Sequence, residues 1–274
     1  MSVFEAIVLG ITQGLTEFLP ISSTAHLRIV PAFAGWEDPG AAFTAVTQLG
    51  TMAAVLLYFR ADLLRIGRAW LRSLRDRAAR REHDARLGWY IILGTIPIGV
   101  FGLAFKDQIE TGARDLYLIG VALIVLGLLL LVAERVATHD RPLERITRRD
   151  GILIGVAQAL ALVPGVSRSG STITAGLFLG FDRTSAARFS FLLSVPAVVL
   201  SGLFEFASIL GEGKDTQVGL GALAVSTFLA FVVGYASIAF LLRFLAHHST
   251  IVFVVYRVAL GAIVLVLAGT HVIA

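Results

Sequence analysis

The chain has 274 residues, of which 57% are hydrophobic, with a mean hydropathy of +0.83 and a formal net charge of +4. This apolar share exceeds what a soluble domain of that size needs. Several runs approach the roughly 20 apolar residues that cross a bilayer, which predicts an all-α polytopic membrane protein. The chain has no cysteine, so disulfides, thiolate catalysis and cysteine-ligated metal sites are excluded.

The first apolar segment covers about residues 3–19, stops at Pro20 and resumes as a short stretch at 27–34. Proline ends a helix because it lacks an N–H donor and its ring clashes with the preceding turn. We therefore predict a re-entrant helical hairpin, which enters the membrane and turns back. Such a turn is tolerated only where it is buried in protein or lines a wet cavity.

Polar residues gather around the turn of this hairpin. Gln13 and Glu17 are four residues apart and share one helix face. An intramembrane carboxylate is costly unless it is paired or functional, and oxygen donors suit Mg²⁺ or Ca²⁺. We predict a metal site at Gln13 and Glu17, with a hydrogen bond from Glu17 to a neighbouring helix as the alternative. Further candidates for chemistry or substrate contact are Ser22, Ser23, Thr24 and His26.

The next apolar segments are long enough to span a membrane, at about 41–59, 88–105 and 117–134. Nine arginines lie between Arg60 and Arg86, and five more between Arg135 and Arg149. A nucleic-acid patch is one interpretation of such density. The positive-inside rule accounts better for both clusters as cytoplasmic loops, so we predict no nucleic-acid partner. The loop 106–115 then lies outside.

A second interrupted segment begins the other half of the chain. About residues 151–163 are apolar, Pro164 follows, and the apolar pattern resumes at 173–181. At an offset of 145 residues, identical positions around the two turns include Gly10 and Gly155, Gln13 and Gln158, Leu15 and Leu160, and Ser22 and Ser167. A broken polar segment in corresponding positions of two halves indicates a buried binding site.

The second turn combines one arginine with hydroxyls and glycines where a helix should begin. Helix N-termini bind anions through free N–H groups, and the planar guanidinium of Arg168 suits phosphate. Glycine lets the backbone approach a ligand closely. We predict a phosphate site here, with a simple Arg168–Glu17 ion pair as the alternative. The expected substrate-binding residues of this turn are Gly165, Ser167, Ser169, Gly170 and Thr172.

Three more long segments, about 186–207, 219–242 and 251–273, complete the pattern. With all basic clusters on the inner face, the loop 208–218 lies outside. Each half then holds a hairpin plus three spans, so the halves, about 1–150 and 151–274, are inverted within one membrane domain. The two hairpin tips should meet near the midplane, with Glu17 and Arg168 within about 10 Å, the reach of a metal-bridged phosphate. We expect Arg257 to pair with a carboxylate or to extend toward the surface, with anion binding as the alternative.

A metal-binding face, an arginine, free N–H groups and a nucleophile or base are what phosphoryl transfer needs. The two motifs resemble those of the bacterial undecaprenyl pyrophosphate phosphatase family, also called bacitracin resistance protein BacA. The family pattern of Glu or Gln, three residues and Glu is met by Gln13 and Glu17. Its Leu-Pro-x-Ser-Ser-Thr-x-His run is met by residues 19–26, and its Pro-Gly-x-Ser-Arg-Ser-Gly-x-Thr run by residues 164–172.

This resemblance implies six spans plus two re-entrant hairpins in the bacterial cell membrane, with an active site open to the outer face. It implies hydrolysis of undecaprenyl diphosphate to undecaprenyl phosphate and phosphate for cell-wall synthesis, with Mg²⁺ or Ca²⁺. The candidate catalytic residues are Glu17, Ser23, His26 and Arg168. We favour Ser23 as nucleophile with His26 as its base, over attack by His26 itself or by water. The lipid diphosphate and the membrane are the expected partners, and a homodimer is left open.

Three other functions are alternatives to a lipid-diphosphate phosphatase. Type-2 phosphatidic acid phosphatases share a Ser-x-x-His pattern, but they need a histidine soon after the second motif, and the next one after Arg168 is His247. A transporter or flippase of an anionic or lipid-linked phosphate fits the inverted repeat. A structural scaffold leaves the duplicated polar motifs unexplained.

Overall fold

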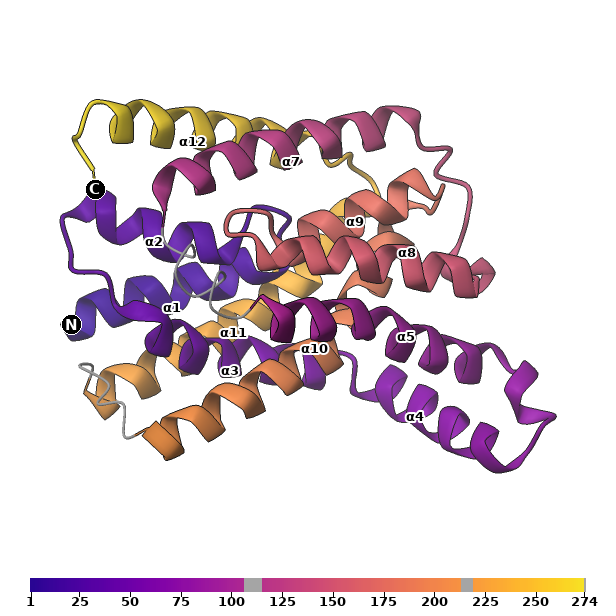
Figure 1. Ribbon diagram of the computed structural model, residues 1–274. Coiled ribbons are helices and arrows are strands. Elements are labelled where there is room, and N and C mark those ends of the chain that lie inside the picture. The colour runs from indigo at the N-terminus through magenta and orange to yellow at the C-terminus, as the bar shows by residue number, and fades with distance from the viewer. Residues whose placement is uncertain (106–114, 213–218, 274) are drawn as a thin grey trace.

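The protein is all-helical over the residues that the computed structural model describes, 1–105, 115–212 and 219–273 (Figure 1). Its α-helices are α1 (Val3–Phe18), α2 (Ser23–Ala34), α3 (Gly40–Tyr58), α4 (Arg60–Arg75), α5 (His83–Ala104), α7 (Leu116–Val136), α8 (Arg148–Ala159), α9 (Arg168–Phe178), α10 (Arg183–Glu212), α11 (Leu220–Leu245) and α12 (Ile251–Gly269). Short 3₁₀ helices are η1 (Ala79–Arg81), η2 (Leu143–Arg145) and η3 (Leu160–Leu162).

Both interrupted segments form helix–turn–helix hairpins, as predicted. α1 ends just before Pro20 and α2 follows, while α8 passes into η3 and stops before Pro164, after which α9 begins. All six long apolar segments are also helical. The predicted outer loop at 106–115 falls outside the described residues except for residue 115. Of the loop predicted at 208–218, residues 208–212 instead belong to α10, and residues 213–218 lie outside the described residues.

One prediction about the basic region is wrong. The arginine-rich stretch after Arg60 was expected to be a loop, but it folds as the 16-residue helix α4, which packs against α5. Its buried residues Ile66, Ala69 and Ser73 recur at helical spacing, while its arginines stay on the outer faces. The high density of arginines favoured a loop in the prediction. The apolar residues of this stretch nevertheless recur with the 3.6-residue period of an amphipathic helix.

Among the described residues, α5, α7, α11 and α12 are helices long and apolar enough to cross a membrane. The segment Phe43–Tyr58 of α3 is apolar but shorter. α7 and α12 lie side by side along one edge of the molecule, and α4 and α5 lie together at the opposite corner (Figure 1). A chain with several helices of this length and composition is a polytopic membrane protein.

The first helix of each hairpin packs against a long helix of the other half. α1 contacts α11 extensively, and α8 contacts α5 in the same way. Glycines permit both approaches: a Cβ on Gly10 would lie 2.5 Å from the carbonyl oxygen of Ser226, and a Cβ on Gly155 would overlap the backbone of Gly94. Gly10 and Gly155 are equivalent positions of the sequence repeat, whose offset is 145 residues. The repeat in sequence is therefore also a repeat in how the helices pack.

We expect Gly10→Ala to destabilise the protein by about 1–3 kcal/mol, the usual cost of overpacking a well-packed interior. The added methyl group meets a backbone carbonyl, which cannot rotate away as a side chain can. Thermal or SDS-induced unfolding in detergent measures the effect. Gly99→Ala on α5 is the matched control, because nothing lies within 4 Å of its Cβ and alanine favours a helix. Equal stability of the two variants would contradict the close-packing argument.

Candidate active site between two hairpin turns

The turns of the two hairpins lie against each other. The first turn is residues 19–22, between α1 and α2, and the second is residues 163–167, between η3 and α9. The Ser169 hydroxyl donates to the carbonyl oxygen of Leu19 at 3.0 Å, which joins the start of α9 to the first turn. The predicted meeting of the hairpin tips is therefore confirmed.

An ion pair crosses from one hairpin to the other. The guanidinium of Arg168, the first residue of α9, donates to Oε1 of Glu17 in the last turn of α1. The other carboxylate oxygen, Oε2, accepts from Gln13 Nε2 at 3.0 Å and from the Ser23 hydroxyl at 2.7 Å. The expected approach of Glu17 and Arg168 is thus a direct contact. The Glu17 side chain is only 6% exposed and that of Arg168 is 17% exposed, so water screens the pair weakly.

Each turn ends in a serine with the same unusual backbone. Ser22 and Ser167 have φ angles of 76° and 72°, in a region that non-glycine residues seldom adopt. Both cap the following helix, since their hydroxyl oxygens accept from Ala25 N–H (3.4 Å) and Gly170 N–H (3.1 Å). The sequence identified both serines but gave no sign of this conformation. Strain of this kind, held in place by its surroundings, concentrates at functional sites.

Two helix N-termini open into the same region. Within the described residues, no acceptor is present for the first backbone N–H groups of α2, at Ser23 and Thr24, or of α9, at Arg168 and Ser169. Their partial positive charges attract anions. Because Glu17 and the Ser169–Leu19 bond hold the two turns together, both N-termini can serve one ligand.

Other residues of the second motif build the turn itself. The Thr172 hydroxyl is fully buried and bonds the Arg168 carbonyl (2.7 Å) and the Ser190 hydroxyl of α10 (2.6 Å). Gly165 has φ +85°, and a Cβ there would come 2.8 Å from the Ile119 carbonyl oxygen of α7. A Cβ on Gly170 would lie 2.6 Å from Arg257 Nη1. These contacts give all three a structural role, and their predicted contact with substrate stays a prediction.

The favoured pairing of Ser23 with His26 is not the one observed. The Ser23 hydroxyl donates to Glu17. The His26 ring nitrogens bond the Ser22 carbonyl oxygen (Nδ1, 2.7 Å) and the Tyr256 hydroxyl (Nε2, 2.6 Å). Glu17 therefore occupies the position of a base for Ser23. The position of His26 in the helix explains why it does not contact Ser23. His26 lies four residues after Ser22, so its ring points back to the Ser22 carbonyl oxygen.

Arg257 differs from its prediction as well. It is 0% exposed, and its described partners are all backbone carbonyl oxygens rather than a carboxylate or the membrane surface. Nη1 donates to Pro20 in the first turn, and Nη2 donates to Gly165 and Val166 in the second, each at 3.1 Å. Arg168 and Arg257 against Glu17 leave one excess positive charge at the site, which favours an anionic ligand.

The donor set fits a divalent cation that shares its ligands with a phosphate. Gln13 is 1% exposed, and its Oε1 has no hydrogen-bond partner in the described structure. This orphaned oxygen and the Glu17 carboxylate are the hard donors that Mg²⁺ and Ca²⁺ prefer. No cluster of three or more His, Asp or Glu side chains occurs among the described residues. A cation here would therefore take its remaining ligands from water or substrate, as Mg²⁺ commonly does.

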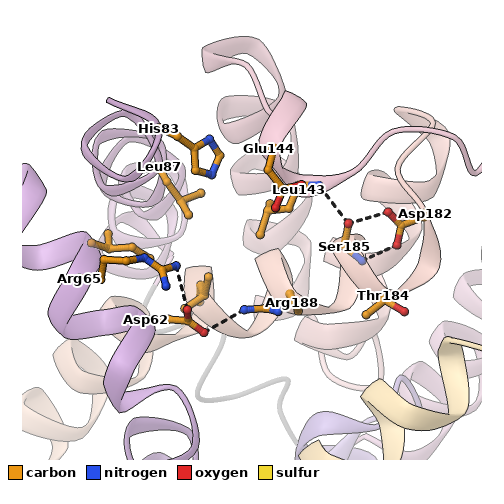
Figure 2. A pocket seen from close by; sticks show the side chains of 12 residues that line it. Asp62, Arg65, His83, Leu87, Leu143, Glu144, Asp182, Thr184, Ser185 and Arg188 are labelled. Atoms are coloured by element: carbon orange, nitrogen blue, oxygen red, sulfur yellow. Dashed lines mark hydrogen bonds and ion pairs between the residues drawn. The ribbon is translucent and has the colours of Figure 1, made fainter. Parts of the chain in front are cut away.

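A separate cavity of about 240 Å³ lies between α4, α5, η2 and α10. Figure 2 shows Asp62 of α4 between Arg65 and Arg188, with a contact of 2.9 Å to each. Neither polar motif contributes to its lining. This cavity is therefore separate from the two hairpin turns, and its arginines share the carboxylate of Asp62.

The fold and the site together define a polytopic membrane protein whose charged site lies between two helical hairpins. The chain belongs to the family described as Bacitracin resistance protein BacA, whose family model matches residues 6–263. It is 57% identical to the undecaprenyl-diphosphatase of a Nocardioides species, with 98% of each chain covered. The undecaprenyl-diphosphatase of Myxococcus xanthus is 56% identical, over 98% of this chain and 90% of that one. That of a Mycobacterium species is 54% identical, over 100% and 99%.

Proposed function

We propose that this protein is an undecaprenyl-diphosphatase, which hydrolyses undecaprenyl diphosphate to undecaprenyl phosphate and phosphate. The family and the names of its full-length relatives support this activity. The observation that carries it in the structure is the Glu17–Arg168 contact between two helix N-termini. That contact joins a base, a phosphate-binding cation and N–H donors in one site. A function in carrier-lipid recycling for cell-wall synthesis, with resistance to bacitracin, belongs to the same proposal.

The finer architecture is also part of the proposal. Six spans and two re-entrant hairpins form one membrane domain of two inverted halves. The matched packing of α1 on α11 and of α8 on α5 supports this arrangement, as do the equivalent conformations of Ser22 and Ser167. We place the protein in the bacterial plasma membrane with its basic segments inside, and the family resemblance implies a site open to the outer face.

In this mechanism, Arg168 and the free N–H groups of α2 and α9 bind the diphosphate and stabilise charge on its terminal phosphoryl group. Ser23 transfers its proton to Glu17 and attacks the terminal phosphorus, forming a phosphoserine as the bond to lipid phosphate breaks. His26 Nε2 then takes a proton from a water molecule, which cleaves the phosphoserine. Glu17 returns its proton to the serine oxygen as phosphate leaves. A divalent cation held by Gln13 and Glu17 would supply neutralisation of the diphosphate charge. Ser22, Ser167 and Ser169 hold the two turns in position.

The test is phosphate release from undecaprenyl diphosphate by the purified protein in detergent. We expect EDTA to lower the rate by about 100-fold or more, because loss of a metal's charge stabilisation removes several kcal/mol from the transition state. Added Mg²⁺ or Ca²⁺ should restore it. A rate that is indifferent to EDTA would contradict the metal site. If the wild-type protein releases no phosphate with either ion, the activity is wrong and transport of a lipid-linked phosphate becomes the better function.

A further inference from the structure

A tyrosine outside both motifs contacts the histidine of the first. The Tyr256 hydroxyl of α12 lies 2.6 Å from His26 Nε2. The two rings are also stacked, with their centroids 5.6 Å apart and their planes 7° from parallel. The residues are 230 positions apart in sequence, so no spacing pattern could have paired them.

The bond at the other ring nitrogen decides which tautomer His26 adopts. His26 Nδ1 lies 2.7 Å from the carbonyl oxygen of Ser22. A carbonyl oxygen can only accept a hydrogen bond, so Nδ1 must carry the proton. In the neutral ring, Nε2 then has a lone pair, and the Tyr256 hydroxyl donates to it. The second partner of an imidazole commonly sets its tautomer in this way.

Tyr256 is the more exposed residue of the pair. His26 is 6% exposed, whereas Tyr256 is 43% exposed. The charged group that acts on His26 is Arg257, which follows Tyr256 on α12. A tyrosine hydroxyl can both donate and accept, so it can remain bonded to Nε2 whether His26 is neutral or protonated. A phenylalanine ring can stack but can do neither.

We propose that Tyr256 is a positioning residue of the phosphatase, acting through His26. Its hydroxyl and its ring hold the imidazole against the first turn, with the proton on Nδ1 and the lone pair on Nε2. This inference rests on the proposed function for its effect on the reaction. The bond between the two side chains can be measured without any activity, which keeps the two proposals separable.

The experiment is Tyr256→Phe in the full-length protein, which keeps the aromatic ring and removes only the hydroxyl. We expect kcat for phosphate release to fall by about 10-fold or more, a part of the effect of general acid–base catalysis, with KM changing less than about twofold. The ¹⁵N spectrum of histidine-labelled protein in detergent should show Nδ1–H alone for wild-type His26 and a mixture of tautomers in the variant. His26→Gln assigns the signals.

Tyr117→Phe is the matched control. The Tyr117 hydroxyl of α7 also bonds α12, at the Ala268 carbonyl 3.0 Å away, but it touches neither hairpin turn. We expect it to leave kcat and the His26 tautomer unchanged. If Tyr256→Phe keeps wild-type kcat, or if the His26 tautomer is the same with and without the hydroxyl, the positioning role is wrong. If the wild-type protein is inactive but its tautomer depends on Tyr256, only the proposed function fails.

Discussion

Replacing Glu17 by glutamine is expected to lower kcat for phosphate release by about 10³-fold, or roughly 4 kcal/mol in activation free energy. The glutamine has the same size, but its single carbonyl oxygen replaces only one of the two carboxylate oxygens, which accept from Arg168 and from Gln13 and Ser23. It cannot take the proton of Ser23, and it removes the only negative charge among the three ionised groups of the site. Because the side chain keeps its size and one acceptor oxygen, we expect the main loss in kcat and a smaller loss of stability from the unpaired Arg168.

The control for this substitution is a second buried carboxylate. Glu134 in the last turns of α7 is ion-paired to Arg183 and accepts a 2.8 Å hydrogen bond from Thr250, remote from both hairpin turns. We expect Glu134→Gln to lower the melting temperature but to keep most of the activity per folded molecule. Comparison of kcat and melting temperature separates the two effects. A Glu17→Gln protein that keeps a tenth or more of wild-type kcat would reduce Glu17 to a structural partner of Arg168.

The hairpins were predictable because their signals are local. Each depends on an apolar run, a proline and a short polar sequence, and those features act within a few residues of the turn. The meeting of the two turns was also predictable, although their ends are 145 residues apart. The prediction used the duplication and placed every basic cluster on one face of the membrane, which fixes an expected orientation for each half. The Glu17–Arg168 contact follows from that constraint.

The wrong predictions at the site concern partners that depend on tertiary structure. The apolar surroundings of Arg257 in the sequence indicate that its charge needs a partner. Only the packing of α12 beside both turns shows that backbone carbonyl oxygens are that partner. In the same way, Ser23 and His26 are close in sequence, yet the fold gives them separate partners in Glu17 and Tyr256. A sequence shows which side chains need a partner, while the partner itself depends on helices that meet across the molecule.

Arg257→Met is expected to destabilise the protein by about 3–5 kcal/mol, the largest stability effect that the structure predicts, by analogy with breaking a buried charged interaction. Methionine fills much of the space but cannot donate hydrogen bonds. The carbonyl oxygens of Pro20, Gly165 and Val166 then lose a donor in a buried environment, at about 1–3 kcal/mol for each group left unsatisfied. Since these oxygens belong to both turns, the two hairpins should separate before the rest of the fold melts.

SDS-induced unfolding in detergent measures this effect, and protease sensitivity at the turns reports the separation. Arg243→Met is the control, because Arg243 is an exposed residue in the last turn of α11, where we expect a change within about 0.5 kcal/mol. Arg257→Lys should give an intermediate loss, since one ammonium group has three donors for carbonyls that approach from several directions. If Arg257→Met instead unfolds like the wild-type protein and only weakens diphosphate binding, Arg257 is a ligand of the substrate rather than the group that joins the two turns.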